Sequence, residues 1–266
     1  MELTLGLIGA GNMAGAILNG ILTKDILPAG RIYLSNRHEN KLEQWKQRGI
    51  HTTTDNREVA RQADLLILAV KPQMLGDVLP QIAEFTKDKC VISIAAGISS
   101  AYLRRELPGC HPILVMPNTP LLLGKGATAI VKRAEDVPQE EYDAVTAIFS
   151  AAGTVAFVTE EQLNTVIPVN GSSPAFFFRL AEAMVAEAEK RGIDGATALE
   201  LTARTMEGAA AMLLQSGKTA AELTRQVCSP GGTTLAALTA WDEFRFDDMM
   251  DKAFTRCIRR AEELGK

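Results

Sequence analysis

Two short turns carry the residues of this 266-residue chain whose types and spacing could do chemistry. The first is Gly9-Ala10-Gly11-Asn12-Met13-Ala14, and the second, far along the chain, is Ser229-Pro230-Gly231-Gly232-Thr233-Thr234. Each opens a predicted helix, where free backbone N–H groups favour an anion. The first turn can hold a cofactor pyrophosphate, and the second can hold a small carboxylate with hydroxyls beside it. Together they indicate a reductase that moves hydride onto a small anionic substrate.

The first turn has the context of a dinucleotide fingerprint. It follows a predicted strand, Leu3–Ile8, and opens a helix predicted over Asn12–Leu22. In the pattern Gly-x-Gly-x-x-Ala, glycines allow a tight turn and a close approach of the backbone to the pyrophosphate. We therefore expect residues 9–14 to bind the cofactor. The alternative is an ordinary tight turn between strand and helix.

The end of the second predicted strand, Arg31–Ser35, favours NADP over NAD. An NAD enzyme usually places Asp or Glu there to bind the ribose 2′-hydroxyl. This chain has Ser35, Asn36 and Arg37, whose hydroxyl, amide and guanidinium donors suit a 2′-phosphate. We expect NADPH as the cofactor, with NADH as a poorer donor. In the alternative, Arg37 only pairs with a neighbouring carboxylate such as Glu39.

Two further segments are expected at the same edge of the sheet. Ala69-Val70-Lys71-Pro72 lies at the end of one buried strand, and Ala95-Ala96-Gly97 follows the next strand. Ligands of open α/β sheets bind at the carboxyl ends of the strands. Small residues there let a flat ring or a ribose lie against the backbone. Lys71 is either a phosphate contact or a solvated lysine.

The pattern of elements predicts an α/β protein with two domains. Apolar runs at 65–70, 91–94, 113–116, 126–131 and 154–158 alternate with helical patterns that include 39–48 and 138–150. Such alternation is typical of a Rossmann-like, doubly wound sheet, here assigned to residues 1–160. No β-like run follows. Helices are predicted at 175–191, 194–216, 219–227, 233–242 and 247–264, so residues 161–266 form an all-helical dimerisation and substrate domain.

The helical half is rich in alanine and glycine, which lets helices approach one another closely. We expect this half to be buried against a second copy, and the alternative is a self-contained bundle. The aromatic run Phe176–Phe178 and Met184 are predicted to be core.

Composition excludes several other classes of protein. A net charge of −4 does not suit a nucleic-acid partner, and no apolar run approaches membrane-spanning length. Only His38, His51 and His111 are present, without the partner pattern of a triad or a metal site, so no metal is expected. The cysteines, at 90, 110, 228 and 257, have no disulfide or metal spacing, which together with the direct start into a strand predicts a cytoplasmic protein.

The chain resembles the pyrroline-5-carboxylate reductase family, collinearly over nearly its whole length. The resemblance is carried by the motifs above and by Met116-Pro117-Asn118-Thr119-Pro120 and Gly171-Ser172-Ser173-Pro174-Ala175. It implies reduction of 1-pyrroline-5-carboxylate to L-proline with NAD(P)H, the last step of proline biosynthesis. It also implies an intertwined homodimer that often assembles into larger homo-oligomers.

Site residues follow from the resemblance position by position. Asn56 joins the cofactor residues. Gly232, Thr233 and Thr234 would hold the substrate, with Thr234 as the catalytic residue whose hydroxyl faces the ring nitrogen. Glu160 and Gln226 match positions near the substrate.

The chain also departs from the family pattern. Leu114-Val115 stands where arginine is frequent, and Lys218-Thr219 and Trp241-Asp242 replace other usual residues. Two alternatives therefore stay open. One is a related imine or ketone reductase with a different small carboxylate substrate, and the other is a non-catalytic, NADP-sensing paralogue.

Overall fold

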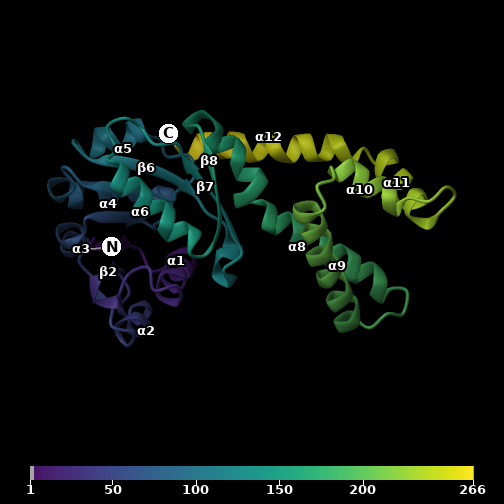
Figure 1. The fold of residues 1–266 in the computed structure, drawn as a ribbon, viewed down its shortest axis with the longest axis horizontal. Coiled ribbons are helices and arrows are strands. Elements are labelled where there is room, and N and C mark those ends of the chain that lie inside the picture. Colours follow the sequence, from purple (N-terminus) through teal and green to yellow (C-terminus); the bar gives the residue numbers. More distant parts are fainter. Residues whose placement is uncertain (1–2, 266) are drawn as a thin grey trace. The chain divides into compact units, whose positions relative to one another are not determined.

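The computed structural model describes residues 3–265, and its strands form one eight-stranded sheet (Figure 1). The strand order is β3-β2-β1-β4-β5-β6-β7-β8. The strands are β1 Leu5–Ile8, β2 Ile32–Ser35, β3 His51–Thr53, β4 Leu65–Leu68, β5 Cys90–Ser93, β6 His111–Met116, β7 Gly126–Val131 and β8 Gly153–Val158. The predicted Rossmann-like α/β architecture is confirmed.

The first six strands are parallel, but the sheet changes direction after β6. Strand β7 runs antiparallel to β6, and β8 runs parallel to β7. A parallel return needs a crossover of about a dozen residues or more. Only residues 117–125 join β6 to β7, and they contain the 3₁₀ turn Thr119–Leu123. The short connection therefore reverses the chain.

Helices cover both faces of the sheet. These helices are α1 Asn12–Thr23, α2 Glu43–Lys46, α3 Asn56–Gln62, α4 Leu75–Ile82, α5 Ser100–Glu106, α6 Gln139–Ser150 and α7 Leu163–Val166. Leu65 and Ile67 of β4 share a buried cluster with α1 and α6, whereas Leu66 and Leu68 share one with α3, α4 and α5. Because successive side chains of a strand point to opposite faces, the sheet has two apolar faces. Helices pack on both faces and fix the position of the strand ends.

The second half of the chain is helical, as predicted, and no strand follows Val158 within residues 3–265. Its helices are α8 Ser173–Glu189, α9 Gly195–Gln215, α10 Ala220–Val227, α11 Thr233–Glu243 and α12 Phe246–Leu264. The carboxylate of Asp194 accepts the N–H of Thr197 at 3.0 Å, which confirms the predicted cap of α9.

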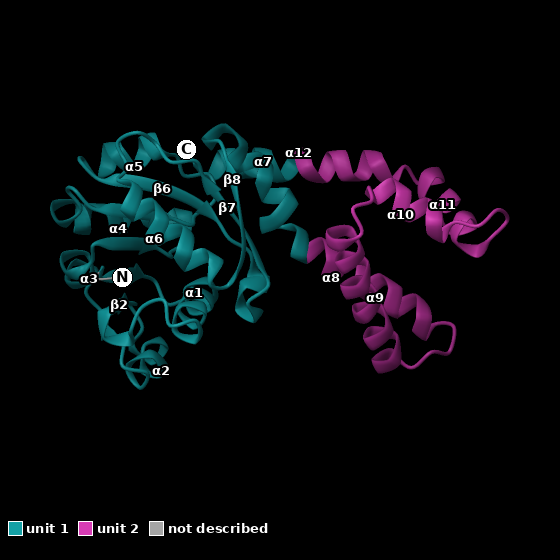
Figure 2. Cartoon of the chain, in the orientation of Figure 1, with its two compact units in different colours: residues 1–174, 256–266 teal, residues 175–255 magenta. Residues whose placement is uncertain are grey.

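The chain divides into two compact units, residues 1–174 with 256–266 and residues 175–255 (Figure 2). The last turns of α12 belong to the sheet unit, where Ala261 is buried in the apolar cluster beneath α4 and α5. This division is not the division at residue 160 that the sequence suggests. The domain boundary therefore stays a prediction.

The unit of residues 175–255 has almost no core of its own. Within it only Ala198, Thr202 and Leu223 are buried. Phe177 and Phe178 are 58% and 68% exposed, and Met184 is 47% exposed. The prediction that this run is core is wrong for the single chain, because no other segment of the unit covers it. An apolar surface of this kind is typical of a protein interface.

Candidate active site

The glycine loop lies at the point where the strand order reverses, between β1 and β4. Gly9 has a φ of +106°, and a Cβ there would come within 2.6 Å of the carbonyl oxygen of Ala69. Only glycine fits, because the left-handed conformation and the close backbone both exclude a side chain. The N–H of Gly9 donates to the carbonyl of Ser35 at 2.9 Å, which fixes the loop to β2.

The N-terminus of α1 is open to an anion. Gly11 occupies the N-cap position, no side chain caps the helix, and its first turn carries no acidic residue. A Cβ on Gly11 would meet nothing within 4 Å, so the space in front of the helix is free. The first-turn N–H groups of a helix have no intrahelical partner. The residues present therefore fit a dinucleotide pyrophosphate.

A cavity of about 340 Å³ extends from this loop along the strand ends. Nine predicted cofactor residues line it: Gly9, Ala10, Gly11, Asn36, Arg37, Asn56, Ala69, Val70 and Lys71. Its other lining residues are Ile8, His38, Lys41, Met74 and Val78. The remaining predicted cofactor residues, Asn12, Met13, Ala14, Ser35, Pro72, Ala95, Ala96 and Gly97, do not line this cavity.

Sequence reasoning missed five of these lining residues. The basic character of His38 and Lys41, so soon after Arg37, was an available signal. Met74 and Val78 gave none, because apolar residues one turn apart are typical of any buried helix.

Ser35 has a different place from the one expected. Its side chain is fully buried, and its hydroxyl donates to Oδ1 of Asn56 at 2.7 Å. The Nδ2 of Asn56 in turn donates to Gln81 at 3.1 Å. Ser35 therefore orients Asn56 rather than reaching the cavity, because a buried hydroxyl needs its partner inside the protein.

The cavity is lined by cations and by no carboxylate. Arg37, Lys41 and Lys71 line it, together with His38. Among residues 3–265, no ion pair joins Arg37 to a carboxylate; its Nε donates instead to Nε2 of His38 at 3.0 Å. Glu39 lines a separate hollow beside Glu43. The alternative pairing of Arg37 with Glu39 does not form, and the guanidinium remains available for a phosphate.

The segment Ala95–Gly97, which follows β5, packs against the C-terminal end of α12. Gly97 has a φ of +81°, and a Cβ there would overlap the carbonyl oxygen of Ala261. On β5, the hydroxyl of Ser93 accepts the N–H of Ala95 at 3.3 Å. Contacts with β5 and with α12 thus fix the position of residues 95–97.

Gly97→Ala is expected to lower the free energy of unfolding by about 3 kcal/mol, because it combines a left-handed backbone with a steric overlap. Urea denaturation measures this loss. The control is Gly76→Ala in α4, where a Cβ meets nothing within 4 Å. That control is expected to be neutral or stabilising by up to about 1 kcal/mol. Equal stability of the two variants would show that α12 does not support this edge.

The predicted substrate residues lie in different parts of the fold. Glu160 belongs to the sheet unit, whereas Gln226, Gly232, Thr233 and Thr234 belong to residues 175–255. Gln226 is exposed on α10 and lines a shallow hollow with Lys218, Glu222 and Arg225, not with the threonines.

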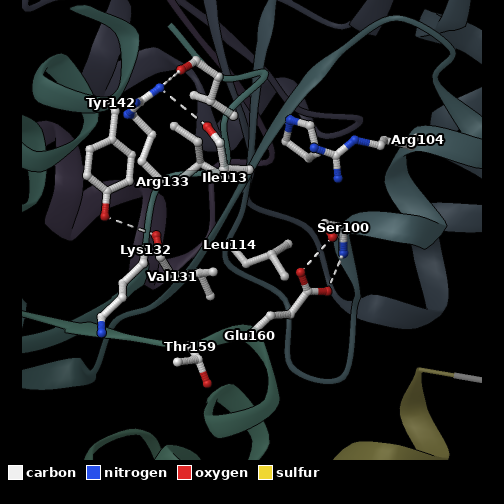
Figure 3. Close-up of a pocket in the computed structure, with 13 residues that line it drawn as sticks. Ser100, Arg104, Ile113, Leu114, Val131, Lys132, Arg133, Tyr142, Thr159 and Glu160 are labelled. Atoms are coloured by element: carbon white, nitrogen blue, oxygen red, sulfur yellow. Dashed lines mark hydrogen bonds between the residues drawn. The ribbon is translucent and has the colours of Figure 1, made fainter. Parts of the chain in front are cut away.

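Glu160 lines a cavity of about 210 Å³ between α5, β6 and β7 (Figure 3). Its carboxylate accepts the N–H of Ser100 at 2.8 Å and the hydroxyl of Ser100 at 2.6 Å. The cavity arises because β6 and β7 pair only at their ends, Val115 with Ile130 and Met116 with Ala129. Both oxygens of Glu160 are thus bonded to Ser100 at the start of α5. Ser100 lies sixty residues away in the sequence, and the sequence did not indicate this contact.

The groups around that cavity have altered acidities. The Arg104 guanidinium beside Asp136 holds the pKa of that carboxyl below its usual range, and the two make a bidentate pair. Burial raises the pKa of Tyr142, whose hydroxyl donates to the carbonyl of Val131 at 3.0 Å. Each of these groups already has a partner within the protein, which is typical of a structural role.

The turn before α11 has the geometry expected of an anion site. Gly231 has a φ of +68°, and Gly232 is the N-cap residue. No side chain caps α11, and no acidic residue stands in its first turn. Thr233 is exposed and Thr234 is half-buried. The first-turn N–H groups and two hydroxyls are therefore available to a small carboxylate.

Residues 3–265 contain no group of three or more His, Cys, Asp or Glu that could hold a metal ion. All four cysteines are free thiols, and burial raises the pKa of Cys110 to about 11 and that of Cys90 as well, so neither is a ready nucleophile. No helix in this range is both long and apolar enough to cross a membrane.

Comparison with known proteins agrees with this geometry. The family model described as pyrroline-5-carboxylate reductase dimerisation matches residues 160–264, and the model described as NADP oxidoreductase, coenzyme F420-dependent, matches residues 4–97. The pyrroline-5-carboxylate reductase of Escherichia coli is 36% identical, with all of both chains covered.

Solved structures give the same result. The pyrroline-5-carboxylate reductase from Coxiella burnetii is 34% identical and superposes with a TM-score of 0.89 over 100% of each chain. The NADP-bound pyrroline carboxylate reductase from Plasmodium falciparum is 24% identical, with a TM-score of 0.91 over 100% of this chain and 99% of that one, and it supports the fold.

Proposed function

The chain belongs to the pyrroline-5-carboxylate reductase family, and we propose that it reduces 1-pyrroline-5-carboxylate to L-proline with NADPH. This reaction is the last step of proline biosynthesis. The observation that carries the proposal is the uncapped start of α11, where Thr233 and Thr234 offer free N–H groups and hydroxyls together. The N–H of Gly232 is already used, because it donates to the carbonyl of Ser229 at 2.9 Å. The cation-lined cavity beside Gly9 and Gly11 supports NADPH as the hydride donor.

The residues of the sheet edge would hold the cofactor. The N-terminus of α1 suits the pyrophosphate, and Asn36 and Arg37 suit the 2′-phosphate. Ala95–Gly97 offers a side-chain-poor surface for a flat ring. When bound, NADPH supplies the hydride from C4 of its nicotinamide. NADH lacks the phosphate that Arg37 would bind, so it is the poorer donor.

The first turn of α11 would hold the substrate. The N–H groups of Thr233 and Thr234 bind the carboxylate beside Gly232, and the Thr234 hydroxyl hydrogen-bonds the ring nitrogen. Threonine is a weak acid, so we propose that the imine binds already protonated as an iminium. The imine carbon then receives the hydride, and the nitrogen keeps its proton as the amine of proline. Thr234 contributes by orienting the ring.

Gln226 and Glu160 are the remaining members of the proposed substrate site. Glu160 would have to release Ser100 before it could contact a substrate, because both of its oxygens accept hydrogen bonds from that residue. The exposed side chain of Gln226 is unhindered.

The matched dimerisation region indicates a homo-oligomer. We propose a homodimer, able to assemble further, in which the exposed apolar side chains of residues 175–255 are covered by the partner. Four free thiols agree with the proposed cytoplasmic location. The proposed partners are a second copy of the chain and the small substrate, and we propose no nucleic-acid or membrane partner.

The test of the function is the loss of NADPH absorbance when pyrroline-5-carboxylate is added to the purified protein, with NADH in parallel. We expect turnover with both and faster turnover with NADPH. Tight NADPH binding without turnover would point instead to an NADP-sensing protein. Turnover only with another cyclic imine or ketone would indicate a related reductase.

Arg37→Gln is expected to weaken NADPH binding about tenfold and to leave NADH binding unchanged, because only NADPH carries the phosphate that the guanidinium would bind. Quenching of tryptophan fluorescence on titration measures both affinities. The control is Arg61→Gln on α3, whose guanidinium stacks 4.7 Å from the Phe85 ring and does not line the cavity. Equal weakening of both dinucleotides would contradict the assignment of Arg37.

A further inference from the structure

The turn after β2 holds a histidine against the arginine that faces the cofactor cavity. The N–H of His38 donates to Oδ1 of Asn36 at 2.9 Å, and the Nε of Arg37 donates to Nε2 of His38 at 3.0 Å. The carbonyl of His38 accepts the N–H of Lys41 at 3.2 Å. Arg37, His38 and Lys41 thus belong to one hydrogen-bonded turn, and all three line the cavity.

The contact between Arg37 and His38 exists only while the imidazole is neutral at Nε2. A protonated ring has two N–H donors and no acceptor, so it would meet the Arg37 guanidinium as a like charge. Histidine is the side chain whose charge ordinarily changes between pH 5 and 8. Protonation of His38 would therefore break its contact with Arg37 and place two cations side by side.

The other charged side chains that line the cavity with His38 are cations. Lys41 lies on the same turn, and Lys71 reaches the cavity from the end of β4. No carboxylate lines the cavity; Glu39 lines the neighbouring hollow, and Asp55 caps α3 by accepting the N–H of Arg57 at 2.9 Å. An anion that binds between these cations would remove their mutual repulsion.

We propose that His38 is a specificity-determining residue for the dinucleotide, taking up a proton as a 2′-phosphate binds beside Arg37 and Lys41. This inference rests on the proposed use of NADPH. A ribose 2′-hydroxyl carries no charge to compensate the new cation, so the proton is not taken up with NADH. The preference for NADPH over NADH accordingly rises as the pH falls from about 8 to about 6.5.

The phosphate itself titrates near pH 6, which weakens its own binding in acid. A variant that lacks only the imidazole separates the two effects. His38→Gln keeps an exposed polar side chain of similar reach and should not disturb folding, because His38 is exposed. Lys41→Gln is the matched control, since it removes a permanent charge from the same turn.

The test is calorimetric binding of adenosine 2′,5′-bisphosphate and of 5′-AMP to the full chain at about pH 6.5 and 8, each in two buffers of different ionisation enthalpy. For the bisphosphate, we expect the affinity of the unmodified protein to gain about fourfold over His38→Gln on going to the lower pH, with net proton uptake beyond that of the variant. Binding of 5′-AMP should change equally in both proteins. Lys41→Gln should weaken the bisphosphate at both pH values and keep the proton uptake.

Equal pH dependence and equal proton uptake in the unmodified protein and His38→Gln would overturn the role of His38 while leaving the cofactor assignment intact. A bisphosphate that binds no better than 5′-AMP at either pH would overturn both this inference and the proposed preference for NADPH. Because no substrate is present, neither outcome depends on catalytic activity.

Discussion

Thr234→Ala is expected to lower kcat for pyrroline-5-carboxylate reduction about a hundredfold and to change the Kd for NADPH less than about twofold. The half-buried Thr234 stands in the uncapped first turn of α11, and we propose that its hydroxyl binds the ring nitrogen. Its removal takes away an interaction proposed to orient the imine, and Thr234 is not among the residues that line the cofactor cavity. Steady-state kinetics and a direct titration with NADPH measure the two quantities.

Thr239→Ala is the matched control for that experiment. Thr239 lies on the same helix, is exposed, and its hydroxyl donates back to the carbonyl of Leu235 at 3.0 Å. We expect its kcat to stay within about twofold of the unmodified protein. A Thr234→Ala enzyme with equal losses in turnover and in NADPH affinity would show that Thr234 is misplaced in this account.

Gly9→Ala is expected to cost about 3 kcal/mol of folding stability and to abolish dinucleotide binding. A methyl group at this position, with a φ of +106°, would stand 2.6 Å from the carbonyl oxygen of Ala69. The loop could accept it only by moving away from β4, and the N-terminus of α1 would move with it. Thermal or urea denaturation and NADPH titration give the two measurements.

Gly11→Ala separates binding from stability at the same loop. Its φ is −83° and a Cβ there meets no protein atom within 4 Å, so the fold should tolerate alanine. The methyl group would occupy the space where a pyrophosphate approaches the backbone. We expect stability within about 0.5 kcal/mol of the unmodified protein and NADPH binding weakened about tenfold or more. Normal NADPH binding in both variants would contradict the placement of the pyrophosphate.

Much of the fold could be predicted because its strands are short, buried and apolar. The run from Leu65 to Val70 became β4, and Gly126–Val131 matches β7 residue for residue. Strand β3, His51–Thr53, was missed because three polar-leaning residues give no apolar run. The helix predicted over 39–48 breaks into a 3₁₀ turn and α2, in which Leu42 and Trp45 are the buried anchors. Two anchors are too few to fix the length of a helix.

The candidate site was predictable where backbone chemistry decides it. The spacing of Gly9 and Gly11, together with Asn36 and Arg37 at the end of β2, identified one side of the cavity. Interactions between distant segments were not predictable in this way. The hydrogen bond from Ser35 to Asn56 and the close packing of Gly97 against α12 depend on tertiary contacts that no local sequence pattern encodes. The exposed run at Phe177 and Phe178 looked like core because a single sequence does not distinguish a core from an interface.

The most direct test of the central claim is the fate of the hydride. The protein would be incubated with pyrroline-5-carboxylate and NADPH carrying deuterium at both C4 positions, and the product would be analysed by mass spectrometry. The account predicts L-proline with one deuterium on the former imine carbon, formed in equal amount to the NADPH consumed. Oxidation of NADPH without labelled proline, or no product in the presence of tightly bound NADPH, would contradict it.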